Sequence, residues 1–251
     1  MPAEGWTHIH LDRTDSTLCD LRRPEVAALT APFVLVTADY QTAGRGQRGT
    51  TWEADAGLNL LFGIRVCPTF LRPDGQFALS ELTALAIAET LDEWVHGVSI
   101  KWPNDIYCGS RKICGMLLEH DIAGGRLSRT LIGPGININQ AEFRGDAPNP
   151  VSLRQLLGRP VSREAVMNRL LARFARYYAA LQRGGAAERL HRAYGERLYW
   201  RDGRLHDFAD ARGAFRARLD GVEPDGRLRL TDASGVTRHY AFKEIRYVLC
   251  S

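Results

Sequence analysis

The chain has 251 residues, of which 45% are hydrophobic, 25% charged and 9% aromatic, and its 33 basic and 29 acidic side chains give a net charge of +4. This composition excludes disordered, collagen-like and disulfide-rich proteins, and no apolar run reaches the roughly 18 residues that a membrane-spanning helix needs. Only three basic residues are lysines, Lys101, Lys112 and Lys243. We expect a soluble globular protein of one or two domains with a substantial core.

The N-terminal segment and the cysteines indicate a reducing compartment. Residues 1–15 have neither the basic region nor the apolar run of a secretory signal, so we expect a cytoplasmic protein. The five cysteines are scattered and never spaced as C-x2-C, which argues against a structural disulfide or a zinc site. His8 and His10 are interpreted as alternate positions on an early strand rather than as a metal-binding pair.

The first half of the chain alternates predicted strands with one helix. The apolar runs 33–40 and 59–66 predict buried strands on either side of a glycine-rich loop. Ser80 is the expected N-cap of a helix that stops before Gly97, and a strand follows over 98–102. The helical spacing is carried by Leu82, Leu85, Ala86, Glu89 and Trp94.

Two further strands and two helices are predicted in the middle of the chain. The strands cover 112–119 and 128–137, and Ser162 opens the longest helix, which ends before Gly184. Its apolar face is expected to carry Val166, Leu170, Phe174, Tyr177 and Leu181. A last helix carries Leu190, Tyr194 and Leu198. The mixture predicts an α+β domain over 1–199, with a mixed β-sheet packed with helices.

Residues 200–251 differ in character from the rest. Short alternating runs over 215–222, 226–232, 236–242 and 245–249, separated by glycine-containing turns, predict a small all-β module. Residues 1–150 carry a net charge of −5 and residues 151–251 a net charge of +9. A basic tail of this kind is compatible with a nucleic-acid-binding module, but arginines that alternate with apolar residues on strands more often form a solvated face.

The loop Gly44–Gly49, GRGQRG, formally matches the dinucleotide-binding pattern G-x-G-x-x-G. That pattern requires a helix directly after the glycines and an acidic residue about 20 positions later, and neither is present here. The loop instead places Arg45 and Arg48 among three glycines, where guanidinium groups and backbone N–H groups can surround an anionic ligand.

A second segment, Lys101-Trp102-Pro103-Asn104-Asp105, ends a predicted strand and is followed closely by Lys112. Two of the three lysines therefore fall within twelve residues of a chain in which arginine is the usual cation. A retained lysine suggests a place that fits a compact ammonium group and not a planar guanidinium. A third segment, Gly133 to Asn137, ends another strand with glycines and an amide.

Together these segments resemble the biotin–protein ligases, in the short form without an N-terminal DNA-binding domain. The resemblance rests on Ser16-Thr17, Gln41 with the GRGQRG loop, Trp52, KWPND at 101–105, Arg111-Lys112 with Gly115, and Gly133-x-Gly135-Ile-Asn137. It is strong over about residues 10–140. It implies the class II synthetase-like biotin/lipoate ligase fold, with a C-terminal SH3-like β-barrel over 200–251.

The resemblance implies a two-step reaction with ATP and biotin as substrates and Mg²⁺ as the accompanying ion. Biotin is first activated as biotinyl-5′-adenylate and then transferred to a lysine of a biotin carboxyl carrier protein. Because a carboxylate must approach an anionic triphosphate, cations have to bridge the two. Arg45 and Lys112 are the expected catalytic residues.

The remaining site residues divide between the two substrates. The expected biotin-binding residues are Ser16, Thr17, Gln41, Gly44, Arg45, Gly46, Gln47, Lys112 and Gly115. The expected ATP- or adenylate-binding residues are Arg48, Trp52, Lys101, Asn104, Asp105 and Asn137. The cleft between them should otherwise be apolar.

Two positions depart from the family pattern: Leu18 stands where Asn is frequent, and Gln47 stands where many bacterial members have Arg. Only 15 residues precede Ser16, so we expect no winged-helix module and no DNA partner. A homodimer is compatible with the sequence, and no membrane partner is expected. The alternatives are a lipoyl or octanoyl ligase of the same fold and a nucleic-acid-binding module that uses the basic tail.

Overall fold

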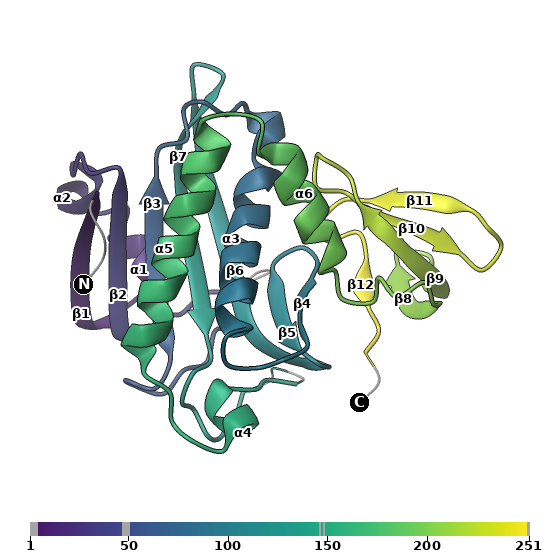
Figure 1. Cartoon of the computed structure of the whole chain (residues 1–251), viewed down its shortest axis with the longest axis horizontal. Coiled ribbons are helices and arrows are strands. Elements are labelled where there is room, and N and C mark those ends of the chain that lie inside the picture. The colour runs from purple at the N-terminus through teal and green to yellow at the C-terminus, as the bar shows by residue number, and fades with distance from the viewer. Residues whose placement is uncertain (1–4, 47–50, 146, 148, 250–251) are drawn as a thin grey trace.

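Two β-sheets organise the protein in the computed structural model, which describes residues 5–46, 51–145, 147 and 149–249 (Figure 1). The larger sheet has seven strands in the order β1-β2-β3-β7-β6-β5-β4. Its strands are β1 (Trp6–Thr14), β2 (Phe33–Gln41), β3 (Leu60–Val66), β4 (Val98–Lys101), β5 (Asp105–Cys108), β6 (Arg111–Ala123) and β7 (Arg126–Ile136). Strands β1 and β2 pair in parallel and the other neighbours pair antiparallel, so the predicted mixed sheet is confirmed.

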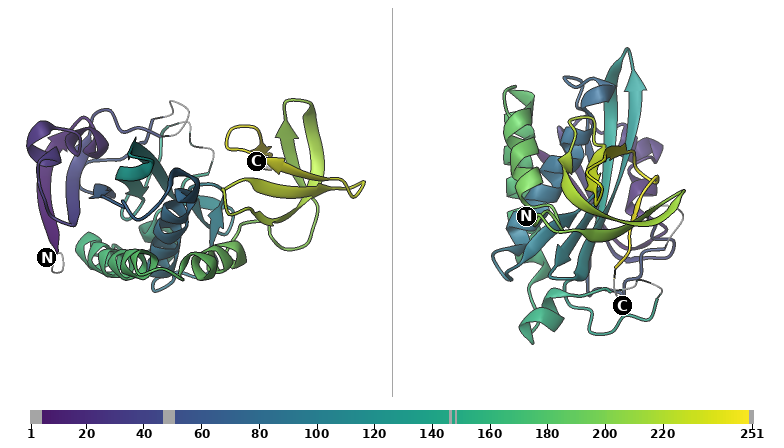
Figure 2. Two further views of the ribbon diagram at one scale, coloured as in Figure 1. Left: turned by 90° about the horizontal axis from the view of Figure 1, so that it is seen from above. Right: turned by 90° about the vertical axis from the view of Figure 1, so that its right-hand side faces the viewer.

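Helices cover both faces of the seven-stranded sheet. Helices α3 (Phe77–Leu91), α5 (Arg163–Gln182) and α6 (Ala187–Glu196) lie on one face (Figures 1 and 2). The short helices α1 (Thr17–Asp20) and α2 (Pro24–Ala27) bury Leu18, Leu21 and Val26 against the other face. A third short helix, α4, spans Leu153–Leu157. Every residue of β3 is buried, as expected for a strand between two covered faces.

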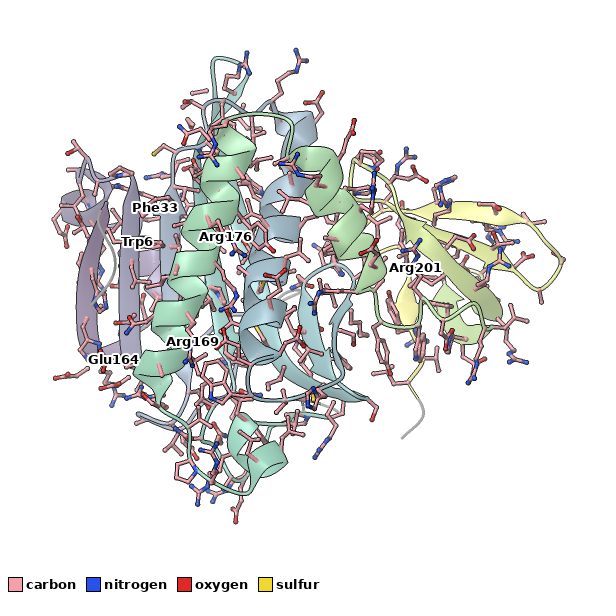
Figure 3. All side chains as sticks on the ribbon, viewed as in Figure 1. Trp6, Phe33, Glu164, Arg169, Arg176 and Arg201 are labelled. Carbon is pink, nitrogen blue, oxygen red and sulfur yellow. The ribbon has the colours of Figure 1, made fainter. Side chains whose placement is uncertain are left out.

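The longest helix begins where the sequence predicts, but one residue of its predicted apolar face is wrong. Ser162 caps α5 by accepting a hydrogen bond from the Ala165 N–H. Tyr178, not Tyr177, enters the core, where its ring meets Phe33 at 5.4 Å. Figure 3 shows Trp6 and Phe33 beside α5, and their rings stack at 4.6 Å. Tyr177 stays at the helix edge because its hydroxyl donates to Glu89 at 2.5 Å.

The predicted N-cap of α3 at Ser80 is wrong, because the helix begins at Phe77. A 3₁₀ turn over Pro73–Gly75 leads directly into it, and Phe77 packs edge-on against Tyr194 at 5.5 Å. Burial of Phe77, and not a side-chain cap, therefore sets this start. The helix ends at Leu91, before Trp94. Strand β5 was not anticipated from the sequence, although the expected early strand with His8 and His10 at alternate positions is present.

The C-terminal residues form a separate five-stranded antiparallel sheet in the order β11-β10-β9-β8-β12. Its strands are β8 (His206–Asp210), β9 (Gly213–Val222), β10 (Leu228–Asp232), β11 (Thr237–Tyr240) and β12 (Arg246–Tyr247). This arrangement is consistent with the SH3-like module expected from the family resemblance, although β8 was not anticipated. The boundary at residue 200 between domains 1–199 and 200–251 stays a prediction.

The β9–β10 turn joins the two sheets. The Trp102 indole N–H donates to the Gly226 carbonyl at 2.9 Å, and Gly226 packs directly on the Phe77 ring. Gly226 has φ +90, and a Cβ there would lie 2.7 Å from Phe77 Cδ2.

Within the described residues, no helix has both the length and the apolar character needed to cross a bilayer.

We predict that Gly226→Ala destabilises the protein by about 1–3 kcal/mol more than Gly235→Ala, because both residues have positive φ but only Gly226 packs on another ring. Gly235 has φ +87 and no atom within 4 Å of its added Cβ, so it controls for backbone strain. Urea unfolding of the two variants measures the difference. Equal losses would show that the turn does not anchor the C-terminal sheet.

Candidate active site

A cavity of about 690 Å³ lies where the ends of the large sheet meet the C-terminal sheet. Its walls combine apolar side chains such as Leu18, Phe62 and Met116 with cations and amides. Twelve of the residues predicted from the sequence line it: Ser16, Thr17, Gln41, Arg45, Gly46, Trp52, Lys101, Asn104, Asp105, Lys112, Gly115 and Asn137. The sequence therefore identified residues from segments far apart in the chain that the fold brings together.

Among the predicted site residues that the structure describes, only Gly44 does not line this cavity. Gly44 lies beside it, where a Cβ would be 3.0 Å from the Trp52 carbonyl oxygen and 3.2 Å from Gln41 Nε2. The small size of Gly44 thus makes room for protein atoms, and its assignment as a biotin-binding residue stays a prediction. Gln47 and Arg48 lie outside the described residues.

The polar end formed by Ser16, Thr17 and Gln41 is held by hydrogen bonds between α1 and β2. Gln41 Oε1 accepts from both the Thr17 N–H at 2.8 Å and the Thr17 hydroxyl at 3.1 Å. The Ser16 N–H donates to Asp15 Oδ1 at 2.7 Å. Because its carbonyl oxygen is engaged, Gln41 is fixed in orientation beside the cavity. Leu18 is buried and would meet a Cβ at Gly133 at 2.7 Å, so this position contributes an apolar wall.

Two glycines form a flat floor under the indole of Trp52. Gly115 of β6 and Gly135 of β7 are direct partners across the two strands. A Cβ at Gly135 would lie 2.5 Å from Trp52 Cε2, and one at Gly115 would lie 3.1 Å from Trp52 Cζ3. The Trp52 N–H and the Asn137 side-chain oxygen are buried with no hydrogen-bond partner among the described residues. Both groups can therefore hydrogen-bond a bound molecule.

The KWPND segment forms the turn of the β4–β5 hairpin, and this turn accounts for the spacing between Lys101 and Asp105. Lys101 and Asp105 are direct partners across the hairpin, so the three residues between them form the turn. The Asn104 side-chain amide donates to the Met116 carbonyl, and the Met116 N–H donates to the Asn104 carbonyl at 3.0 Å. These bonds attach the turn to β6. With the turn in this position, Asp105 Oδ1 lies 2.7 Å from Lys112 Nζ. This ion pair forms a charged end of the cavity.

Arg45 is also paired with a carboxylate. Its Nη2 lies 3.3 Å from Glu119 Oε1, and the other oxygen of Glu119 accepts from Arg22 at 2.8 Å. Arg45 and Thr51 form an isolated antiparallel bridge, which closes the base of the glycine-rich loop. The two residues expected to be catalytic therefore each have an acidic partner on a neighbouring strand.

Sequence reasoning missed the contribution of the C-terminal sheet. Phe242, Ile245, Arg246 and Tyr247 line the cavity, and the Phe242 ring meets Trp102 at 6.3 Å. These contacts join positions more than a hundred residues apart, and no local motif marks them. The one sequence feature that could have pointed to this part of the C-terminal sheet was Lys243, the third lysine. It has φ +78, and its Nζ lies 5.8 Å from the centroid of the Phe242 ring.

Comparison with known proteins identifies the family to which this chain belongs. The model of the biotin/lipoate A/B protein ligase family matches residues 13–137. The chain is 32% identical over 243 residues to the biotin–[acetyl-CoA-carboxylase] ligase of Paracoccus denitrificans, covering 90% of this chain and 94% of that protein. It is 30% identical over 234 residues to the bifunctional ligase/repressor BirA of Bacillus subtilis, covering 86% and 67%.

Solved structures agree on the fold. The biotin protein ligase of Aquifex aeolicus, in complex with biotin and ATP, superposes with a TM-score of 0.79 at 23% identity and covers 96% of this chain and 99% of that one. The protein belongs to the biotin/lipoate protein ligase family.

We predict that Gly135→Ala displaces the Trp52 ring, because the added Cβ would lie within 3 Å of three indole atoms. Fluorine NMR of fluorotryptophan-labelled protein, with Trp52→Phe to assign the signal, should show a shifted Trp52 resonance. Gly75→Ala is the control, since its Cβ would make only an ordinary contact of 3.7 Å with Leu71. An unmoved Trp52 resonance in Gly135→Ala would contradict the close packing described above.

Proposed function

We propose that this cavity is the active site of an ATP-dependent biotin–protein ligase. The observation that carries the proposal is the meeting of the family motifs in one cavity that has an amide end, an apolar middle and a cationic end. In the first step, a biotin carboxylate oxygen bonds to the α-phosphorus of ATP and pyrophosphate leaves. In the second, a lysine amine of the carrier protein attacks the acyl carbon, loses a proton and releases AMP.

Arg45 and Lys112 are proposed to bring the two anionic substrates together. Each is held by a carboxylate, Arg45 by Glu119 and Lys112 by Asp105. An incoming carboxylate or phosphate can share each cation with its carboxylate partner, so that neither the cation nor the carboxylate is left unpaired in the cavity. Cations fixed in this way stabilise charge that develops at the phosphate at no cost of reorganisation.

The opposite end is proposed to bind the ureido ring of biotin. Ser16, Thr17 and Gln41 supply hydroxyl and amide groups there, and Gln41 has its orientation fixed by Thr17. Gly46 and Gly115 line the cavity without side-chain bulk. Leu18, Phe62 and Met116 provide the apolar surface that suits a thiophene ring and an alkyl chain.

ATP is proposed to lie against Trp52, Lys101, Asn104, Asp105 and Asn137. The unpartnered Asn137 oxygen and Trp52 N–H would offer one acceptor and one donor to the nucleotide. We propose Mg²⁺ as the accompanying ion, which in ATP enzymes takes one or two carboxylates together with phosphate oxygens and water. Asp105 supplies a carboxylate at this end of the cavity, so the donor set fits, and the ion would screen the phosphate charges.

The proposed partner is a biotin carboxyl carrier protein or domain of a biotin-dependent carboxylase, in the cytoplasm. No DNA partner is proposed, and a homodimer stays a further expectation. The ion pairs of the basic tail support its interpretation as a solvated face and not a nucleic-acid-binding one. Arg218, Arg227 and Arg229 lie 2.8, 2.7 and 3.0 Å from the carboxylates of Asp220, Asp225 and Glu223, respectively.

Pyrophosphate exchange tests the substrate assignment. We predict that the protein exchanges labelled pyrophosphate into ATP when biotin and Mg²⁺ are present, and that octanoate or lipoate in place of biotin gives no exchange. Exchange that required octanoate or lipoate and ignored biotin would favour the lipoyl or octanoyl ligase instead.

We predict that Lys112→Arg lowers the single-turnover rate of biotin adenylation by at least about 100-fold, as expected when a preorganised charge is misplaced. The Lys112 ammonium lies close to Asp105, the Trp52 ring and Gly115, and the longer, planar guanidinium of arginine would place its charge elsewhere. Lys243→Arg makes the same chemical change outside the cavity and should retain the wild-type rate. Equal small losses in both variants would refute the role given to Lys112.

A further inference from the structure

The Lys101 ammonium lies between two tyrosine rings that come from different sheets. Its Nζ is 5.4 Å from the centroid of Tyr107 and 4.7 Å from the centroid of Tyr247. Tyr107 belongs to β5 of the same hairpin, and Tyr247 belongs to β12 of the C-terminal sheet. Ring faces attract cations at these separations, most strongly where water is excluded.

The Tyr247 ring is fixed by one aromatic neighbour from its own sheet, Phe208, and by Trp200, which precedes that sheet. It packs against Phe208 at 5.0 Å and Trp200 at 5.3 Å, and the Tyr247 backbone pairs with Phe208 across β12 and β8. The ring therefore presents a rigid face to Lys101. A long lysine side chain loses considerable rotamer freedom when it is held in one place, so a rigid neighbour lowers the cost of ordering it during binding.

The Tyr247 hydroxyl contributes little to this arrangement. Its oxygen is buried and has no hydrogen-bond partner among the described residues. Burial raises the pKa of the Tyr247 phenol above its ordinary value, so the group stays neutral near pH 7. The useful part of the residue is thus its ring face, which a phenylalanine would supply equally well.

We propose that Tyr247 is a positioning residue through which the C-terminal sheet orients the Lys101 ammonium toward the phosphates of ATP. This inference rests on the proposed function, in which Lys101 lies on the ATP side of the cavity. It gives the C-terminal sheet a role in the first chemical step. It also accounts for lysine at position 101, since a compact ammonium fits between two rings at the base of a hairpin.

The test compares Tyr247→Phe with Tyr247→Leu, and uses Phe215→Leu as the matched control. Phe215 belongs to the same aromatic group, 6.3 Å from Phe208, but its cationic neighbour is Arg238 and not Lys101. Tyr247→Leu should raise the Kd and KM for ATP by about 3- to 30-fold, the range expected for loss of a cation–π contact. Tyr247→Phe should bind ATP as the wild type does, and Phe215→Leu should lose stability without weakening ATP binding.

A double-mutant cycle separates positioning from general damage. If Tyr247 acts through Lys101, then Tyr247→Leu should have no further effect on ATP binding in a Lys101→Gln background, and the Kd for biotin should stay at the wild-type value. Unchanged ATP binding in Tyr247→Leu, an equal loss in Tyr247→Phe, or additive effects with Lys101→Gln would overturn the proposal. Failure of the wild type to exchange pyrophosphate with biotin would instead overturn the proposed function, and this inference with it.

Discussion

The Asp105 carboxylate lies 2.7 Å from Lys112 Nζ, and the Asp105 backbone is the partner of Lys101 across the β4–β5 hairpin, so one residue links a charged contact with β6 to the register of β4. Two ammonium groups and an arginine gathered around one cavity would repel one another if no acid balanced them. Asp105 and Glu119 provide that balance, each from a strand whose position is set by the sheet. The cations are therefore ready for an anionic ligand while each retains a partner, and this condition determines where the KWPND hairpin must lie.

The remaining walls are arranged around that charged end. Gly115 and Gly135 leave space for the Trp52 indole, which also lies 5.7 Å from Lys112 Nζ and thereby joins the floor to the cation. The C-terminal sheet closes another side, anchored by the bond from Trp102 to the Gly226 carbonyl. Trp102 belongs to the same hairpin as Lys101 and Asp105. One short turn thus positions the charges and attaches the sheet that completes the cavity.

Local chemistry decided what the sequence could predict. Ser162 was identifiable as a helix cap because its hydrogen bond lies within its own turn, whereas KWPND was singled out by its closely spaced lysine, amide and carboxylate and by the family resemblance. The start of α3 at Phe77 and the burial of Tyr178 were missed because distant packing sets them. Phe242 and Tyr247 were missed for the same reason. The lysine imbalance proved a better signal than the net charge, since all three lysines lie near aromatic rings at or beside the cavity.

Transfer of biotin to a carrier-protein lysine in this cavity can be measured by intact-mass analysis of a carrier domain. The carrier domain would be incubated with the protein, ATP, Mg²⁺ and an equimolar mixture of biotin, lipoate and octanoate. We expect one biotinyl group on the acceptor lysine, and no adduct when that lysine is replaced by arginine or when ATP is omitted. A lipoyl or octanoyl adduct, or no adduct with a folded protein and carrier, would contradict this expectation.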